Sequence, residues 1–467
     1  MKLKIILFSL FCTALAMLSC NRDEISFEEP SQLLRFSKDT VFCDTVYHQV
    51  RSESYAVKVY NQEDKDVMIP KIELGFGAAS NYRINVDGKS GYSFTNIPLR
   101  RNDSLYIFIE IAPTAHGTES IAEDRILFTS GAGPQHVTLF SVVQDAEFFI
   151  QSSTSPNILT GNNVWDSNKV KIIYGDLTLD QNATLDIMPG TKVYFFKNSG
   201  MKVRNGATLN VMGSFGNEVI MRGDRNETYY DTIPKNWNSM LFEAGSALNM
   251  NYARVFGGIR GIDLRESTAT IKNSIIHTFD EYGIHAVNAT LNAENLVMNN
   301  SAKADLGIFK GGNYNIVHST LANYWREKYS LGDGEALFAT NRWQNGSGQT
   351  EFGDLTLNIR NSILYTYTPN AVRFDPVSGQ QFDYQIQNSL LKYSSGAGFS
   401  FDSNPNIVSS WQNQDPKFEK HYTHEMNLRV KSDSPAKAKG DLTVAASVPL
   451  DIAQIARTTS PTLGAYQ

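Results

Sequence analysis

The sequence has little cysteine, no long run of basic residues and none of the short motifs that mark common catalytic sites. Its three cysteines, Cys12, Cys20 and Cys43, are too few for a disulfide framework or a four-ligand zinc site. The formal net charge is −6 and no basic run occurs, which argues against nucleic acid as a partner. No Gly-rich phosphate loop, HExxH zinc motif or GxSxG nucleophile motif is present. The sequence therefore predicts no metal site, no cofactor and no catalytic function based on a motif.

The sequence does have a globular composition and enough length for more than one domain. Hydrophobic residues make up 41% of the 467 residues and charged residues 19%, as in folded rather than disordered or collagen-like chains. A chain of this length is expected to form about two or three domains.

A short apolar segment at the N-terminus predicts export. Lys2 and Lys4 precede an apolar run over residues 5–17, which has the length of a signal-peptide core and is too short to span a membrane. The run ends in Leu18-Ser19-Cys20, which resembles the lipobox of bacterial lipoproteins. A plain secretory signal is the alternative.

The lipobox resemblance implies cleavage before Cys20 and acylation of its thiol. Residues 1–19 would then be a signal peptide, and residues 20–30 a tether to a lipid membrane. Residues 21–24, Asn-Arg-Asp-Glu, look like the export signal of Bacteroidota surface lipoproteins, and an ordinary hydrophilic tether is the alternative. Together these resemblances imply a lipid anchor in the outer membrane, with the chain exposed at the cell surface. Cys43 would be left as a thiol without a disulfide partner, and we expect it to be a small buried hydrophobic residue.

Residues 31–150 are predicted to form short strands separated by turns. The strands are expected at Tyr55–Tyr60, Ser104–Ile111, Arg125–Ser130 and His136–Val143. Such strands, with turn signals about every ten residues, predict an antiparallel β-sandwich. The segments Val57–Asn61 and Asp124–Ser130 resemble immunoglobulin-like modules of the abnormal-spindle and choice-of-anchor type. Another kind of β-sandwich is the alternative.

The composition changes after residue 150, and a repeat begins. Asparagine occurs 33 times in residues 151–430 but only 6 times in residues 20–150. Asparagine tolerates left-handed backbone and stacks in ladders, which are both features of parallel coils. The segment Ala183–Ile187 recurs 24 residues later as Ala207–Val211 and again at 247–250. A second marker, two polar residues and then two apolar ones, begins at Asn273, Glu294, His318, Asn361 and Asn388.

A repeat of 20 to 30 residues built from short strands predicts a solenoid with three strands per coil. The two repeated markers resemble those of the right-handed parallel β-helix in the pectate-lyase-like superfamily. That resemblance covers residues 151–430, and residues 431–467 are expected to form a C-terminal capping segment. The fold class expected for the chain is therefore all-β, a sandwich followed by a parallel β-helix.

Two stretches interrupt the repeat and are expected to be loops that carry aromatic rings. Residues 223–238 contain Trp237, Tyr229 and Tyr230; residues 324–353 contain Tyr324, Trp325, Tyr329 and Trp343. Exposed rings stack on sugars, so Trp237, Tyr324, Trp325, Tyr329 and Trp343 are the candidate ligand-binding residues. The alternative, which we favour, is that these rings pack the loops onto the coil.

The best acid–base neighbourhood lies at residues 277–285. It contains His277, Asp280, Glu281 and His285, with Arg260 and Arg265 one coil earlier. By resemblance, β-helix lyases combine carboxylates that hold Ca²⁺ or neutralise a uronate with a basic residue, so Ca²⁺ is expected only if the chain is a lyase. The motif sets of pectate lyases and polygalacturonases are absent. A solvated turn with surface histidines is the favoured alternative.

Four short sites match the Asp-Ser/Thr-apolar pattern of Bacteroidota O-glycosylation. Their acceptor residues would be Thr40, Thr45, Ser104 and Thr232, and Thr232 is favoured because a loop is expected there.

The function expected from these features is that of a cell-surface binding or structural module. The face of the β-helix would contact a polysaccharide or a surface protein. A polysaccharide lyase or glycoside hydrolase is the alternative.

Overall fold

The computed structural model describes residues 26–43, 45–47, 52–111, 119–152, 156–225, 228–325, 334–421 and 426–467. The predicted signal peptide, residues 1–19, and the predicted acylation site Cys20 lie outside these residues. The chain forms two compact units, Met1–Gln144 and Asp145–Gln467. Among the described helices, none has the length and the apolar character needed to cross a membrane.

The first unit is a β-sandwich of two mainly antiparallel sheets, as the sequence predicts. One sheet has the strand order β1 (Arg35–Phe36), β4 (Tyr55–Tyr60), β9 (Ser104–Ile111), β6 (Tyr82–Val86) and β7 (Lys89–Gly91). The other contains β2 (Thr40–Phe42), β11 (Gln135–Gln144), β10 (Glu119–Thr129), β5 (Val67–Leu74) and β8 (Ser93–Leu99), with β3 (Val46–Tyr47) beside β11. A single 3-10 turn, η1 (Gly77–Ala79), is also described.

Alternating side chains of both sheets fill the core of this sandwich. Val57 and Val59 of β4 and Ile107 and Ile109 of β9 are buried, while the residues between them face outward. This period of two is what a half-buried strand requires. Cys43 is buried in the same core, which confirms its expected place.

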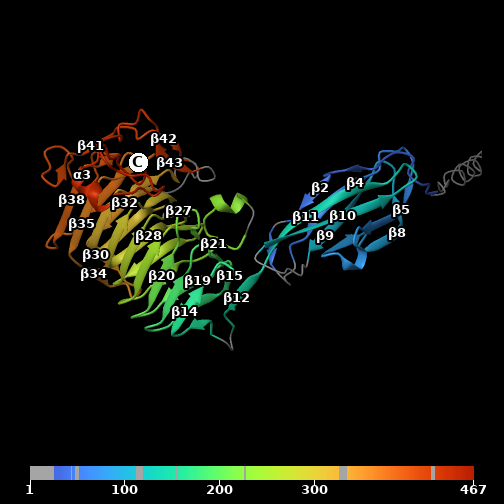
Figure 1. Cartoon of the computed structure of the whole chain (residues 1–467), viewed down its shortest axis with the longest axis horizontal. Coiled ribbons are helices and arrows are strands. Elements are labelled where there is room, and N and C mark those ends of the chain that lie inside the picture. Colours follow the sequence, from blue (N-terminus) through green and yellow to red (C-terminus); the bar gives the residue numbers. More distant parts are fainter. Residues whose placement is uncertain are drawn as a thin grey trace, which may run out of the picture. The chain divides into compact units, whose positions relative to one another are not determined.

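The second unit is a parallel β-solenoid, and its strands stack in sequence order (Figure 1). One sheet, the first row, contains β12 (Ala146–Ile150), β15 (Val170–Tyr174), β18 (Lys192–Phe195), β21 (Val219–Gly223), β24 (Ala253–Phe256), β27 (Ile275–Phe279), β29 (Val297–Ser301), β31 (Thr320–Asn323), β36 (Ile363–Thr366), β39 (Leu390–Leu391) and β41 (Trp411–Gln412).

The other large sheet supplies two strands to most coils, so that these coils have three strands in all. In two coils it supplies one long strand instead, Tyr282–Glu294 or Ala304–Val317. Its strands are β13 (Ile158–Leu159), β14 (Asn162–Trp165), β16 (Asp176–Leu179), β17 (Thr184–Ile187), β19 (Gly200–Val203), β20 (Thr208–Met212), β22 (Met240–Phe242), β23 (Ala247–Asn251), β25 (Arg260–Arg265), β26 (Thr268–Lys272), β28 (Tyr282–Glu294), β30 (Ala304–Val317), β32 (Glu335–Thr340), β35 (Leu355–Arg360), β37 (Val372–Asp375), β38 (Phe382–Gln387) and β40 (Ile407–Val408).

The repeat seen in the sequence sets the register of this stack. Leu185 of β17 pairs with Leu209 of β20, which pairs with Leu248 of β23. These side chains are fully or almost fully buried, as are Ile187 and Val211. Ile275, the first of the two apolar residues in the marker that begins at Asn273, is only partly buried, and the core side chain at that point is its neighbour Ile276. The core of the solenoid is therefore a stack of aliphatic side chains repeated coil by coil.

The second sequence marker forms a turn with its own hydrogen-bond ladder. Asn273, Asn295, Asn361 and Asn388 have φ angles of 48°, 52°, 50° and 46°, in the left-handed region that asparagine tolerates. The serine after the turn residue accepts a backbone N–H from the coil before it: Ser362 Oγ accepts from Ser319 N and Ser389 Oγ from Ser362 N, both at 3.1 Å. This ladder explains the polar pair in the marker.

The chain after β41 lies along the first row. Its elements are the antiparallel pair β42 (Phe418–Lys420) and β43 (Asn427–Val430), and helix α3 (Leu442–Ser447). Asn361 Nδ2 donates to Asp441 O at 3.0 Å, and Ala465 N donates to Thr320 Oγ1 at 3.0 Å. This C-terminal segment, residues 413–467, thus covers several coils on their first-row side.

The two stretches expected to be loops are partly regular structure. Residues 228–232 form the 3-10 turn η2 (Thr228–Thr232). Within 324–353, β32 continues the solenoid sheet, and β33 (Arg342–Gln344) pairs with β34 (Thr350–Phe352) as a hairpin. The expectation of a loop throughout 324–353 is therefore wrong, because part of the insertion supplies a strand of the coil.

Candidate functional site

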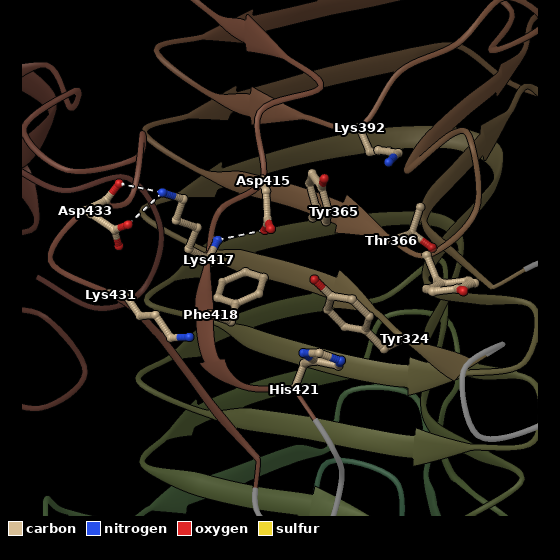
Figure 2. A pocket seen from close by; sticks show the side chains of 11 residues that line it. Tyr324, Tyr365, Thr366, Lys392, Asp415, Lys417, Phe418, His421, Lys431 and Asp433 are labelled. Carbon is tan, nitrogen blue, oxygen red and sulfur yellow. Dashed lines mark hydrogen bonds and ion pairs between the residues drawn. The ribbon is translucent and has the colours of Figure 1, made fainter.

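A pocket of about 570 Å³ lies between the first row and the C-terminal segment (Figure 2). We call it the aromatic–lysine pocket, lined by Tyr324, Tyr365, Thr366, Tyr367, Lys392, Asp415, Lys417, Phe418, His421, Lys431 and Asp433. Residues on or just after β31, β36 and β39 form one wall, and residues 415–421 with Lys431 and Asp433 form the other.

Aromatic rings form one side of this pocket. The ring of Tyr324, one of the candidate ligand-binding residues, stacks on the imidazole of His421 with centroids 4.2 Å apart. Phe418 meets the Tyr324 ring edge-on at 6.3 Å, and Figure 2 shows the three rings grouped together. Tyr324 N donates to Asn299 Oδ1 at 3.1 Å, which fixes the backbone where the ring begins. Tyr367, at 63% exposure, is the most open ring of the site.

Three lysines and two aspartates give the pocket an excess of positive charge. Lys417 Nζ pairs with Asp433 Oδ2 at 2.7 Å, and Asp415 Oδ1 accepts from Lys417 N at 2.8 Å. Lys392 Nζ lies 5.3 Å from the centre of the Tyr365 ring. Burial, and then the charge of Asp415, raise the pKa of Tyr365, so this phenol stays neutral at physiological pH. The pocket therefore offers ring faces and ammonium groups to one ligand.

The residues of the predicted acid–base neighbourhood divide between the two large sheets. His277 lies on β27 in the first row, where its ring stacks on Phe256 at 4.9 Å and its Nε2 accepts from Arg254 Nε at 3.1 Å. Burial lowers the pKa of His277 well below its ordinary value, so the imidazole is neutral. Asp280 pairs with Lys235 at 2.9 Å. The side-chain contacts of His277 and Asp280 thus include none of the remaining candidates.

The remaining candidates do converge, around a carboxylate that we did not single out from the sequence. Asp263 on β25 sits one coil before His285 on β28, and its Oδ1 lies 2.9 Å from His285 Nδ1. Arg260 and Arg265 each place an Nη atom 3.0 Å from Asp263 Oδ2. Arg260 Nε also contacts Glu281 at 2.5 Å. We call this group the Asp263–His285 cluster.

Burial and charge act in opposite directions in the Asp263–His285 cluster. Burial disfavours ionised Asp263, but the hydrogen bond to His285 and the charge of Arg265 outweigh it and lower the pKa of the carboxyl. Burial lowers the pKa of His285, and the bond to Asp263 offsets only part of this. At neutral pH the cluster thus holds a carboxylate beside a neutral imidazole.

The tryptophans are placed differently from the expectation of exposed rings. Trp237 is fully buried, stacks on Phe195 at 4.5 Å and donates from Nε1 to Phe256 O at 2.8 Å. Trp325 is also buried, at 5% exposure. These two rings fill space against the coil, as in the alternative that we favoured from the sequence, so they are not exposed for stacking on a sugar. Trp343 on β33 lies 5.1 Å from the His285 ring and partly covers the Asp263–His285 cluster. Tyr329 lies outside the described residues.

The predicted glycosylation acceptors are all at least partly buried. Thr232, the favoured one, is 7% exposed, and its hydroxyl donates to Tyr229 O at 3.0 Å. Thr40, Thr45 and Ser104 are half-buried, with Thr40 on β2 and Ser104 on β9. This placement does not favour modification of Thr232 in the folded chain.

The described residues contain no group of three or more His, Cys, Asp and Glu side chains placed to hold a metal ion. Within those ranges, therefore, no such group marks a site for the Ca²⁺ ion that the lyase alternative implies.

Most of the aromatic–lysine pocket was missed in the sequence, although a signal for it exists. Tyr365 lies four residues after Asn361, and Lys392 lies four residues after Asn388. The same offset from Asn273 gives His277, also on the first row. Positions that share this offset line up along one side of the coils. The opposite wall, 415–433, carries no such signal because the repeat has already ended.

Comparisons with known proteins do not assign the chain to a family. No family model matches it, and no curated protein does. Several solved structures match at low identity. Among them are the VesB protease of Vibrio cholerae (10% identity, 24% of this chain and 31% of that one, TM-score 0.18), PapD-like domain 7 of human CEP192 (12%, 28% and 96%, 0.18) and a family 123 glycoside hydrolase of Clostridium perfringens (8%, 28% and 30%, 0.20). Such TM-scores support no argument about function.

Proposed function

We propose that the chain is a cell-surface binding module that takes acidic glycans at the aromatic–lysine pocket. The observation that carries the proposal is the combination of ring faces and an excess of lysine in one open pocket of about 570 Å³. This volume lies in the ordinary range of ligand sites.

The chemistry of the pocket matches that of an acidic sugar. Aromatic rings contact the apolar faces of sugars, and ammonium groups attract carboxylates or sulfates. Lys417 is already paired with Asp433, so Lys392 and Lys431 are the cations best placed for a ligand. Among the rings of the pocket, Tyr367 has the largest exposed fraction for contact with a sugar.

We also propose the cellular location that the N-terminal sequence implies. Acylated Cys20 would anchor the chain in the outer membrane of a Bacteroidota-type cell, and the solenoid would be a right-handed β-helix of the pectate-lyase-like kind. Cys20→Ala should move the protein from the membrane to the soluble fraction and abolish uptake of labelled palmitate. A variant that still sediments with membranes would contradict the anchor.

A glycan array with residues 21–467, followed by calorimetry on any acidic glycan retained, tests the binding function. Tyr367→Ala should weaken binding about 2- to 10-fold and Lys392→Gln about 10-fold. The matched control is Tyr229→Ala, since Tyr229 is 69% exposed but lies away from the pocket on η2. If every glycan binds both pocket variants as tightly as the wild type, the pocket is not the site.

A second candidate function, polysaccharide cleavage, rests on the Asp263–His285 cluster. Asp263 and Glu281 share Arg260, and neutral His285 beside a carboxylate has the features of a general base. In this hypothesis His285 takes the proton from the carbon next to the uronate carboxyl group, whose charge Arg260 and Arg265 balance. A C=C bond forms as the glycosidic C–O bond at the neighbouring carbon breaks, and the departing oxygen takes a proton from water. We rank it second because both arginines already bind Asp263 and Trp343 covers the imidazole.

An absorbance assay for unsaturated products on uronate polymers tests the second candidate. His285→Ala should abolish any activity, whereas His136→Ala, at an exposed histidine of the sandwich, should not. If the wild type forms no unsaturated product from any uronate polymer, this hypothesis is wrong.

A further inference from the structure

A second pocket, of about 280 Å³, lies on the same side of the solenoid and is separate from the aromatic–lysine pocket. We call it the arginine pocket. Arg254 of β24 and Arg429 of β43 both line it, together with Glu218, Tyr252, Ile452 and Tyr466. The solenoid supplies Arg254, Glu218 and Tyr252, and the C-terminal segment supplies the others. The pocket is therefore complete only when the C-terminal segment is in place.

Arg254 is held in position without a carboxylate partner. Its Nε donates to His277 Nε2 at 3.1 Å, and its guanidinium lies 5.3 Å from the centre of the Phe256 ring. Burial lowers the pKa of Arg254, while Asp231 and Glu218 act on it only at longer range. Asp231 is itself paired with Arg222 at 2.6 Å. Among the described residues, no carboxylate forms an ion pair with Arg254.

Arg429 brings a second guanidinium to the same space. It lies over the ring of Tyr466 at 4.6 Å, and no ion pair to it is found within the described ranges. Glu218 is the one carboxylate in the pocket lining, and its Oε1 accepts from Gly216 N at 3.0 Å. Two guanidinium groups against one carboxylate leave an excess of one positive charge.

The rest of the lining is apolar or already hydrogen-bonded. Ile452 and the ring of Tyr466 face the cavity from the C-terminal segment, and Tyr252 from the solenoid. The Tyr252 hydroxyl is bonded to Gln454 Nε2, so its ring rather than its oxygen is available. A buried cation without a partner is costly, and an anion that forms paired hydrogen bonds with a guanidinium offsets that cost.

We propose that the arginine pocket binds a small organic anion, with its carboxylate or phosphate group between Arg254 and Arg429 and its apolar part against Ile452 and Tyr466. The volume lies just below the range of drug-sized ligand sites, which suits a ligand no larger than a single ring with its charged group. This inference is independent of glycan binding at the aromatic–lysine pocket.

Calorimetry on the full chain at low ionic strength tests the proposal, with benzoate and phenyl phosphate as probes and benzyl alcohol as the uncharged counterpart. At least one anion should bind and the alcohol should not, and added salt should weaken the binding because the attraction is electrostatic. Binding of benzoate alone would assign a carboxylate ligand, and binding of phenyl phosphate alone a phosphate ester.

Arg429→Gln should weaken probe binding about 10-fold, and it removes a side chain at the surface, where the fold is not at risk. Arg254→Lys keeps the charge but loses the paired hydrogen bonds, and should also weaken binding. Arg342→Gln removes an exposed arginine that is paired with Asp375 elsewhere on the solenoid and serves as the control.

Lys392→Gln separates this proposal from the proposed function, since it should affect glycans but not these probes. The proposal is overturned if neither anion gives a saturable heat of binding. Equal affinity of the wild type and Arg429→Gln, or an equal loss with Arg342→Gln, would overturn it as well.

Discussion

Replacing Asp305 by asparagine should remove one source of pH dependence from the stability of the solenoid. Asp305 lies on β30 with no exposed surface, and its Oδ1 accepts from Ser301 Oγ at 3.0 Å. Its Oδ2 has no hydrogen-bond partner among the described residues. Burial raises the pKa of this carboxyl well above its ordinary value, and the bond from Ser301 offsets only part of the effect.

The sign of the effect follows from proton linkage. A carboxyl whose pKa is higher in the folded than in the unfolded state holds its proton while the unfolded chain releases it. The free energy of unfolding therefore falls as the pH rises above the unfolded pKa of about 4, and levels off at the folded pKa. Within that window the slope from this one group is about 1.4 kcal/mol per pH unit.

Urea unfolding between pH 4 and pH 8, followed by tryptophan fluorescence, measures the slope. Asp305→Asn should lose the wild-type contribution, so the difference between variant and wild type should change steadily with pH inside the window. The control is Asp383→Asn, the same substitution at an exposed position of β38. A difference that stays constant for Asp305→Asn would show that Asp305 is ionised in the folded chain and refute the reasoning.

Two other changes test the packing of the solenoid. Leu209→Ala should cost about 2–5 kcal/mol in unfolding free energy, because the side chain is fully buried in the stack; Leu442→Ala, at 53% exposure, should cost under about 0.5 kcal/mol. Arg457→Met should make residues 441–467 more sensitive to limited proteolysis than Arg342→Met does, since buried Arg457 donates to Leu450 O at 2.6 Å and to Asn295 Oδ1 at 2.9 Å. Equal protease sensitivity of the two arginine variants would show that Arg457 does not hold the segment.

The repeat in the sequence predicted the solenoid because parallel coils stack in register. Leu185, Leu209 and Leu248 occupy equivalent positions in the repeat, and each pairs with the next in the stack. The same rule would have paired Asp263 with His285, which lie one coil apart, had it been applied to polar residues. The alternation of Val57 and Val59 in the sandwich follows equally directly from the period of a half-buried strand.

Only the tertiary structure decided where the residues that interrupt the repeat lie. Trp237 and Trp325 fill gaps against the coil, as in the alternative that we favoured, but periodicity could not decide this because it says nothing about a side chain outside the period. The C-terminal segment brings Phe418 and His421 to Tyr324 and Arg429 to the arginine pocket. These contacts join residues about one hundred or more positions apart, and they depend on how an irregular chain folds back along the first row. The coil was therefore readable from the sequence because it repeats, whereas both pockets depend on packing that occurs only once.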